Sequence, residues 1–287
     1  MAPSMSFIFG LLTFVTVGMI IGAISQLAFI RKLEDSHGTD SRPSRRLRGL
    51  ESEGYLQLPR GINIWNNDKE AEILRLGYVK PEVLSWSPRI ILLHNFLSME
   101  ECDYLRAVAL PRLKVSTVVD PKTGKGIKSG VRTSHGMFLR HDESKYPMVQ
   151  AIEKRISIYS QIPVEHGELL QILRYEKNQF YKPHHDYFSD TFNLKRGGQR
   201  VATMLMYLTD NVEGGETYFP RAGSGDCSCG GKILQGLSVK PTKGNAVLFW
   251  SMGLNGQSDP NTLHGACEVL SGEKWSAVKW MRQEVRN

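Results

Sequence analysis

The chain has 287 residues, of which 41% are hydrophobic, and its formal net charge is +7. This length and composition are typical of one sizeable globular domain with additional segments. The basic residues are dispersed and no basic block studded with aromatic residues is present, which argues against nucleic acid as a partner.

The N-terminal segment 7–30 contains no charged residue. It is long enough to cross a hydrocarbon core of about 30 Å as a helix. A cleaved signal peptide is the alternative, but the apolar run exceeds the usual ~7–15 residues and neither Lys nor Arg precedes it. The sequence therefore predicts a single N-terminal helix that anchors the chain in a membrane and is not cleaved.

A polar stem or linker is expected over residues 31–80, and its first half is rich in Arg and Ser. Basic residues follow the expected anchor and none precedes it. Counting positive charges therefore places the C-terminal part of the chain in the cytoplasm. The folded domain is expected over residues 81–287.

The first elements of this domain have recognisable signals. Residues 89–95 are typical of a short buried strand, and residues 98–110 of a helix that begins with a Ser-x-x-Glu capping box. Apolar residues recur at helical spacing over 146–159 and predict a second helix. The Gly-, Lys- and Ser-rich segment 116–136 is expected to be a long loop or irregular hairpin, either a lid or a flexible connection.

After Gly167 the sequence changes to short apolar runs separated by Gly, Asn and Pro. These runs predict strands at 168–175, 200–209, 216–220, 237–240, 246–250, 267–270 and 275–281. Many short strands at this spacing indicate a mainly β domain, a sandwich or jelly roll, with the two helices packed outside.

Four cysteines are present: Cys102, Cys227, Cys229 and Cys267. The Cys-x-Cys pair has no second Cys or His pair nearby, so it is a poor zinc site. A disulfide between one of that pair and Cys267, with Cys102 free, would require an oxidising compartment. Four reduced thiols are the alternative.

The segment YKPHHDYF contains the candidate metal ligands. In an extended segment residues i and i+2 face the same way, so His184 and Asp186 can meet one metal while His185 points to the other face. His264 follows later, just before an expected strand. Two His and one carboxylate that leave open positions are the ligands of non-haem iron(II) oxygenases. Zinc and two hydrogen-bonded structural histidines are the alternatives.

Lys274 follows His264 by ten residues, so a hairpin would return it to the metal site. A buried ammonium needs an anionic partner, and a dicarboxylic cosubstrate supplies one. Its keto-acid end can chelate the metal while its distal carboxylate pairs with Lys274. Thr217 and Tyr175 could donate hydrogen bonds to that carboxylate. A solvated turn lysine is the alternative interpretation of Lys274.

Longer motifs surround these residues, and together they resemble the prolyl 4-hydroxylases of plants and green algae. The resemblance covers residues 88–281. It rests on the order and spacing of VRTSHGMFL, YKPHHDYF, GGQRVATMLMYL, EGGETYFP, VKPTKGNAVLFW and LHGACEVLSGEKWSAVKWMR.

The resemblance implies a double-stranded β-helix (jelly roll) with helices on one side. It implies that His184, Asp186 and His264 bind Fe(2+), and that Lys274 and Thr217 bind 2-oxoglutarate. The expected reaction hydroxylates C4 of proline, with O2 as the second cosubstrate and succinate and CO2 as products. L-ascorbate is expected to rescue iron that is oxidised in uncoupled turnovers.

The resemblance also implies a groove for a proline-rich peptide in the polyproline II form. The matching positions are Arg132, Ser134, Glu168, Tyr181, Arg200 and Trp280. Arg282 departs from the pattern, because a related algal enzyme has His there. This extra basic residue could select a different flanking sequence in the peptide.

The plant members of the family sit in the endoplasmic reticulum and Golgi with their catalytic domain in the lumen. The resemblance therefore implies a single-pass type II topology, in disagreement with the flanking charges. Two other functions remain open: a dioxygenase of the same fold acting on lysyl side chains or nucleobases, and a jelly-roll binding module without activity. The sequence does not indicate the oligomeric state.

Overall fold

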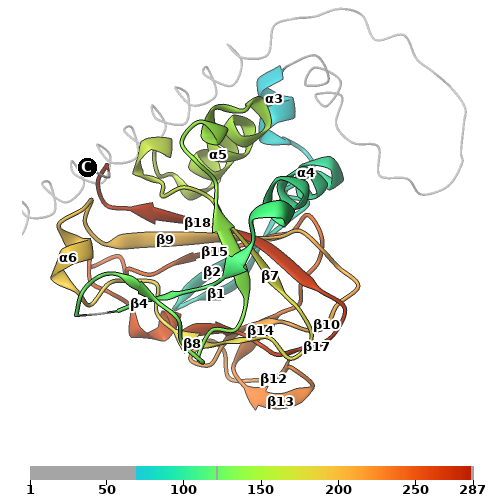
Figure 1. Cartoon of the computed structure of the whole chain (residues 1–287), viewed down its shortest axis with the longest axis vertical. Helices are drawn as coiled ribbons and strands as arrows, with labels where there is room; N and C mark the ends of the chain where they lie inside the picture. The colour runs from blue at the N-terminus through green and yellow to red at the C-terminus, as the bar shows by residue number, and fades with distance from the viewer. Residues whose placement is uncertain (1–68, 121, 286–287) are drawn as a thin grey trace, which may run out of the picture. The chain divides into compact units, whose positions relative to one another are not determined.

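The computed structural model describes residues 69–120 and 122–285 (Figure 1). The anchor expected at 7–30 and most of the expected stem lie outside the described residues. Within the described part, no helix is both long and apolar enough to cross a membrane. Residues 69–80, which the sequence assigns to the stem, contain helix α3 (Lys69–Leu74) and the first residue of strand β1 (Lys80–Trp86).

Two antiparallel sheets make up most of the domain. The larger sheet has the order β1, β2 (Arg89–His94), β15 (Ala246–Trp250), β9 (Arg200–Tyr207), β18 (Lys274–Arg282), β7 (Gln171–Tyr175), β6 (His135–Phe138) and β3 (Lys114–Val115). The smaller sheet has the order β14 (Leu237–Val239), β11 (Thr217–Phe219), β16 (His264–Ala266) and β8 (Tyr181–His184). The domain is therefore mainly β, as expected.

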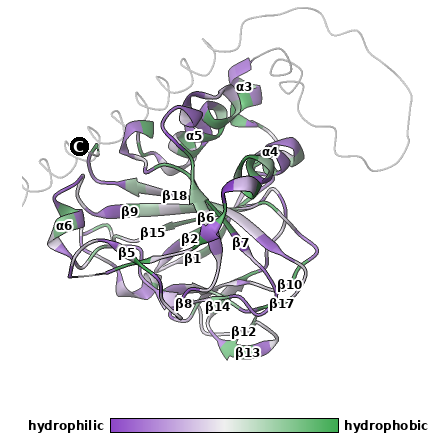
Figure 2. Cartoon of the chain, viewed as in Figure 1, coloured by the Kyte–Doolittle hydropathy of each residue, from purple (hydrophilic) through white to green (hydrophobic). Residues whose placement is uncertain are grey.

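Helices α3, α4 (Met99–Ala109) and α5 (Pro147–Ser160) lie on one face of the larger sheet, and the smaller sheet lies on the other (Figure 1). Leu105 of α4 and Ile152 of α5 are fully buried in one hydrophobic cluster with Met204 of β9. Helices α4 and α5 carry both hydrophobic and hydrophilic residues (Figure 2), as expected of helices with one face on a core.

Strand β18 has one face toward the helices and the other toward the smaller sheet. Its side chains alternate between the faces of the sheet, because the repeat of a strand is two residues. Trp275, Ala277 and Met281 belong to the cluster on the helix side. The residues of the opposite face line the space between the two sheets: Lys274, Ser276, Val278 and Trp280.

Three short hairpins or ribbons and one short helix complete the fold. The pairs are β4 (Val118–Val119) with β5 (Gly126–Ile127), β12 (Asp226–Cys229) with β13 (Lys232–Gln235), and β10 (Glu213–Gly214) with β17 (Val269–Ser271). The short helix is α6 (Thr191–Leu194). The β4–β5 pair falls inside segment 116–136, so this segment is an irregular hairpin.

The two helices predicted within the domain are confirmed to within one or two residues at each end. The Ser98 hydroxyl accepts a hydrogen bond from the Glu101 backbone and the Glu101 carboxylate accepts one from the Ser98 backbone, which is the predicted capping box. The strand predicted at 267–270 was wrong in its bounds. Strand β16 ends at Ala266 and pairs with β11, and the chain then crosses to pair with β10 as β17.

Candidate active site

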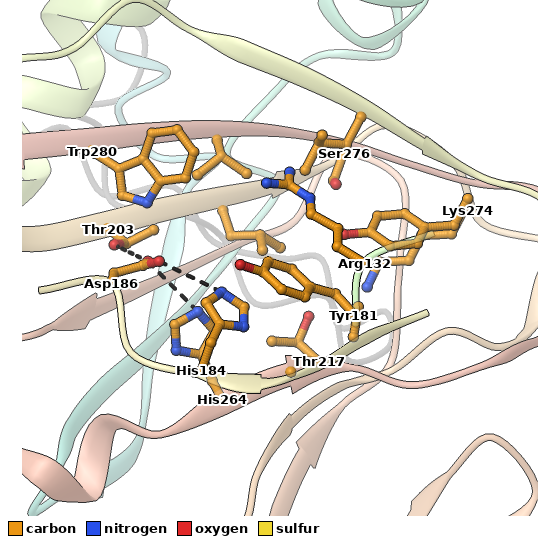
Figure 3. A pocket seen from close by; sticks show the side chains of 16 residues that line it. Arg132, Tyr181, His184, Asp186, Thr203, Thr217, His264, Lys274, Ser276 and Trp280 are labelled. Atoms are coloured by element: carbon orange, nitrogen blue, oxygen red, sulfur yellow. Dashed lines mark hydrogen bonds and ion pairs between the residues drawn. The ribbon is translucent and has the colours of Figure 1, made fainter. Parts of the chain in front are cut away.

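Three candidate metal ligands meet at one end of the space between the sheets. His184 ends β8, Asp186 follows two residues later, and His264 begins β16, where it is the register partner of His184. Asp186 oxygens lie 3.6 Å from Nε2 of His184 and 3.5 Å from Nε2 of His264. One ligand atom from each residue lies within 4.8 Å of the others (Figure 3).

Both imidazole rings have a defined tautomer. Nδ1 of His184 lies 3.0 Å from the Lys182 carbonyl oxygen, and Nδ1 of His264 lies 2.9 Å from that of Thr262. A carbonyl oxygen only accepts, so each Nδ1 carries the proton and each Nε2 lone pair is free for a metal. Burial and the nearby charge of His264 lower the pKa of His184 to about 3, so its ring is neutral at pH 7.

Asp186 is ionised, and a residue of the larger sheet donates a hydrogen bond to it. Burial alone would raise its pKa, but the two histidines, Arg200 and a hydrogen bond from Thr203 lower it to about 2. The Thr203 hydroxyl of β9 donates to Asp186 Oδ2 at 2.7 Å. Two imidazoles from adjacent strands and the carboxylate of Asp186 fit an octahedral metal that keeps exchangeable positions.

His185 points away from these ligands, as strand alternation predicts. Its Nε2 lies 3.0 Å from the Pro260 carbonyl oxygen, and its ring stacks on Tyr187. His185 is absent from the inner pocket that the other two histidines line.

Lys274 lies in the same pocket as the metal ligands and is only 1% exposed. Among the residues that the structure describes, no carboxylate lies within ion-pair distance of its ammonium group. Its Nζ lies 5.4 Å from the ring centroid of Tyr175 and 5.8 Å from that of Tyr207. Burial lowers the pKa of Lys274 to about 7, against the opposing charge of Glu216. An anionic ligand would compensate this buried charge.

Thr217 provides a hydroxyl in the same pocket. Tyr207 donates a 2.8 Å hydrogen bond to Thr217 Oγ1, so the Thr217 hydrogen remains available for another acceptor. Tyr175 is buried beside Lys274, its cross-strand partner, and its hydroxyl lies against Arg132 and Ser134.

The inner pocket has a cavity volume of about 40 Å³ and lies between the metal ligands and Lys274. Its walls are otherwise mostly apolar, with Leu173, Leu205 and Val278 among them. A metal at one end and an uncompensated ammonium at the other match a small dicarboxylate that chelates through its keto-acid end. The residues therefore fit both iron(II) and 2-oxoglutarate.

An outer groove with a volume of about 370 Å³ adjoins this pocket. The β4–β5 hairpin contributes one wall and the segment around Tyr187 another. Arg132, Tyr181 and Trp280 line both the groove and the inner pocket. The Tyr181 ring stacks on the His184 ring, with centroids 3.6 Å apart. The Arg132 guanidinium lies 4.8 Å from the centroid of the same Tyr181 ring.

Arg132 is 7% exposed and its guanidinium has neutral hydrogen-bond partners. It donates to the Thr117 carbonyl, to Gln171 and to Ser134. Ser134 is fully buried and lines neither the pocket nor the groove. In this structure Ser134 therefore orients Arg132 from behind.

Arg200 lines the groove, and its guanidinium lies 3.9 Å from the Trp280 ring centroid. Glu168 accepts two 2.8 Å hydrogen bonds from Arg200 and one of 2.9 Å from Arg282. Neither Glu168 nor Arg282 lines the groove, and both are buried. Arg282 is therefore not placed to contact a peptide directly. The expectation that it selects the flanking sequence of the peptide is not supported by this position.

The cysteines form one disulfide, between Cys229 of β12 and Cys267 just after β16. Cys102 is free and buried, and Cys227 is free and half-buried. The bond joins the β12–β13 hairpin to the strand that carries His264.

Sequence reasoning did not single out Thr203 or Tyr207. Both alternate along β9 with apolar residues that face the helices. This alternation predicts the face of β9 on which they lie, but not the residues that they contact. Their partners, Asp186 and Thr217, come from other strands. The contacts depend on sheet register, for which the local sequence has no signal.

A family model described as the 2OG-Fe(II) oxygenase superfamily matches residues 170–282. The chain is 72% identical over 285 residues to Prolyl 4-hydroxylase 1 of Arabidopsis thaliana, and the match covers 99% of each chain. It is 55% identical over 209 residues to Probable prolyl 4-hydroxylase 3 of the same plant, covering 70% of this chain and 71% of that one.

Among solved structures, the viral collagen prolyl hydroxylase of Paramecium Bursaria Chlorella virus-1, in its 2OG complex, is 26% identical with a TM-score of 0.49. That match covers 73% of this chain and 98% of the viral one.

Proposed function

Because the chain belongs to the prolyl 4-hydroxylase family, we propose that it hydroxylates C4 of proline in proline-rich peptides. It uses iron(II), 2-oxoglutarate and O2, and it releases succinate and CO2. The observation that carries the proposal is one pocket with the triad of His184, Asp186 and His264 at one end. At the other end lies the buried Lys274 ammonium, without a carboxylate partner among the described residues.

The residues of the chain have separate roles in this reaction. His184, Asp186 and His264 hold the iron, and Thr203 and two backbone carbonyls orient them. Iron(II) and 2-oxoglutarate, when bound, supply the oxidising chemistry. Lys274 and Thr217 bind the distal carboxylate and so fix the direction of the cosubstrate. The apolar walls exclude water from the reacting atoms.

The outer groove is the binding site that we propose for the peptide. A proline-rich peptide is preformed as a polyproline II helix and presents flat ring faces and unpaired carbonyls. Tyr181 and Trp280 offer ring faces, and Trp280 Nε1 is buried without a partner among the described residues. Arg132 and Arg200 offer guanidinium donors. Glu168 and Ser134 support them from outside the groove.

The two facing sheets support a double-stranded β-helix. The disulfide between Cys229 and Cys267 supports an oxidising compartment. With the uncharged segment 7–30, this supports a single-pass type II protein of the endoplasmic reticulum or Golgi membrane, with the catalytic domain in the lumen. L-ascorbate is proposed as the reductant that keeps iron in the iron(II) state.

The test uses the full-length chain in detergent with iron(II), 2-oxoglutarate, ascorbate and poly(L-proline). We expect succinate release and, by mass spectrometry, one added oxygen atom per modified proline. Amino-acid analysis should identify 4-hydroxyproline. The Asp186→Ala variant is the matched control. Succinate release that is independent of peptide, or oxygen added to a lysyl or nucleobase substrate instead, would contradict the proposal.

A further inference from the structure

Exposed cations gather where the tip of the β4–β5 hairpin meets helix α6, and we call Lys122, Lys125, Lys195 and Arg196 the cationic rim. The hairpin reaches α6 in Figure 1. At Gly124 a Cβ atom would lie 2.5 Å from Cδ1 of Phe192, so the hairpin tip lies against that ring. The Arg196 guanidinium lies 5.3 Å from the centroid of the same ring. The two segments therefore bring their cations to one place.

The rim carries four positive charges, and two carboxylates, Asp120 and Asp190, lie in the same two segments, so its net charge is positive. All four of its side chains are exposed, and within the described part of the chain none of them forms an ion pair. The Asp120 carboxylate is engaged in its own turn, where it accepts from the Lys122 backbone and the Thr123 hydroxyl. The Asp190 carboxylate caps α6 and accepts from the Asn193 backbone and side chain.

The rim adjoins the outer groove on both sides. Val118, Val119 and Gly126 of the hairpin line the groove, as does Asp190 at the start of α6. A peptide that extends beyond the groove at this side therefore passes the rim. Inside the groove itself Arg132 and Arg200 are opposed by the carboxylates of Asp186 and Asp190, and Glu168 pairs with Arg200, so the excess of positive charge is at the rim.

We propose that the cationic rim selects proline-rich substrates that carry acidic residues just outside the stretch held in the groove. This inference rests on the proposed function and names a substrate class for that site. Opposite charges on substrate and enzyme lower the KM by raising the rate of encounter and the lifetime of the complex. They leave kcat nearly unchanged, because the rim is outside the pocket that holds the reacting atoms.

The test compares proline-rich peptides in which a single Glu is moved outward from the central proline on either side. Each has a partner peptide with Gln at the same position. At low salt we expect the best Glu peptide to have a KM about three- to tenfold below its Gln partner. The difference should shrink at 1 M salt, where the screening length is about 3 Å. Peptide Kd from fluorescence anisotropy should change in the same way.

Two double variants assign the effect to the rim. Lys122→Gln with Lys125→Gln changes the hairpin, and Lys195→Gln with Arg196→Gln changes the residues after α6. Each should reduce the Glu preference while hydroxylation of Gln peptides continues. The control pair is Lys232→Gln with Lys240→Gln, two exposed lysines that do not line the groove.

Equal KM and Kd for Glu and Gln peptides would overturn the inference and leave the proposed function intact. A Glu preference that survives both rim variants, or that the control pair removes equally, would overturn it too. If no peptide is hydroxylated, the proposed function fails, and anisotropy still reports whether the rim distinguishes Glu from Gln.

Discussion

The Thr203 hydroxyl of β9 donates a 2.7 Å hydrogen bond to Oδ2 of Asp186, which follows β8 in the opposite sheet. Thr203 is 1% exposed, so this bond is shielded from water. It fixes which carboxylate oxygen remains free for a metal. Thr203 of the larger sheet thus orients Asp186, which directly follows a strand of the smaller sheet.

Replacing Thr203 should weaken metal binding without removing a ligand. We expect Thr203→Val to lower the affinity for iron(II) about 10- to 100-fold, as for other residues that orient metal ligands. Thr203→Ser keeps the hydroxyl and should retain most of the affinity. Iron titration, followed by the quenching of tryptophan fluorescence, measures both. Equal affinity in the Val variant and the unmodified chain would show that the bond has no such role.

Lys274 should control the affinity for 2-oxoglutarate. Removing one member of a buried charge pair costs roughly 2–5 kcal/mol, so Lys274→Ala should raise the KM for 2-oxoglutarate about 30-fold or more. Tyr207→Phe removes only the bond to Thr217 and should raise this KM less. Steady-state succinate assays at saturating peptide separate these effects. A normal KM in Lys274→Ala would place the distal carboxylate elsewhere.

The affinity for 2-oxoglutarate should depend on pH. The pKa of Lys274 is lowered to about 7 by burial, and a carboxylate ligand binds the protonated form. Binding should therefore be strongest below pH 7 and weaken as the pH rises through that value, by up to about tenfold per unit. Arg does not titrate in this range, so Lys274→Arg, if it binds, should show a flatter profile. Cosubstrate Kd values between pH 6 and 9 test the prediction, and an opposite slope would refute it.

The disulfide should stabilise the domain. The cysteines Cys229 and Cys267 are 38 residues apart, and such a bond contributes about 2–4 kcal/mol. Cys229→Ser should lower the Tm by about 4–16 °C. Cys227→Ser should leave the Tm nearly unchanged, because Cys227 is free. Calorimetry with and without reductant measures these shifts, and reductant should have no further effect on Cys229→Ser.

Much of the fold was accessible from local patterns. The capping box located helix α4, and helical spacing located α5, because helix signals lie within a few residues of one another. The strand pattern after Gly167 indicated a mainly β domain. Strands β1 and β13 were missed, because their exposed residues lack the apolar alternation that marks a half-buried strand.

The sequence by itself determined which chemical groups this protein has and which way some of them face. Alternation at two-residue spacing separated His184 and Asp186 from His185, since this depends only on neighbouring residues. Only the tertiary structure decided what those groups touch. It placed Thr203 against Asp186, paired Cys267 with Cys229 rather than Cys227, and left Lys274 buried without a carboxylate partner among the described residues. These contacts join strands far apart in the chain, and strand pairing and register set them.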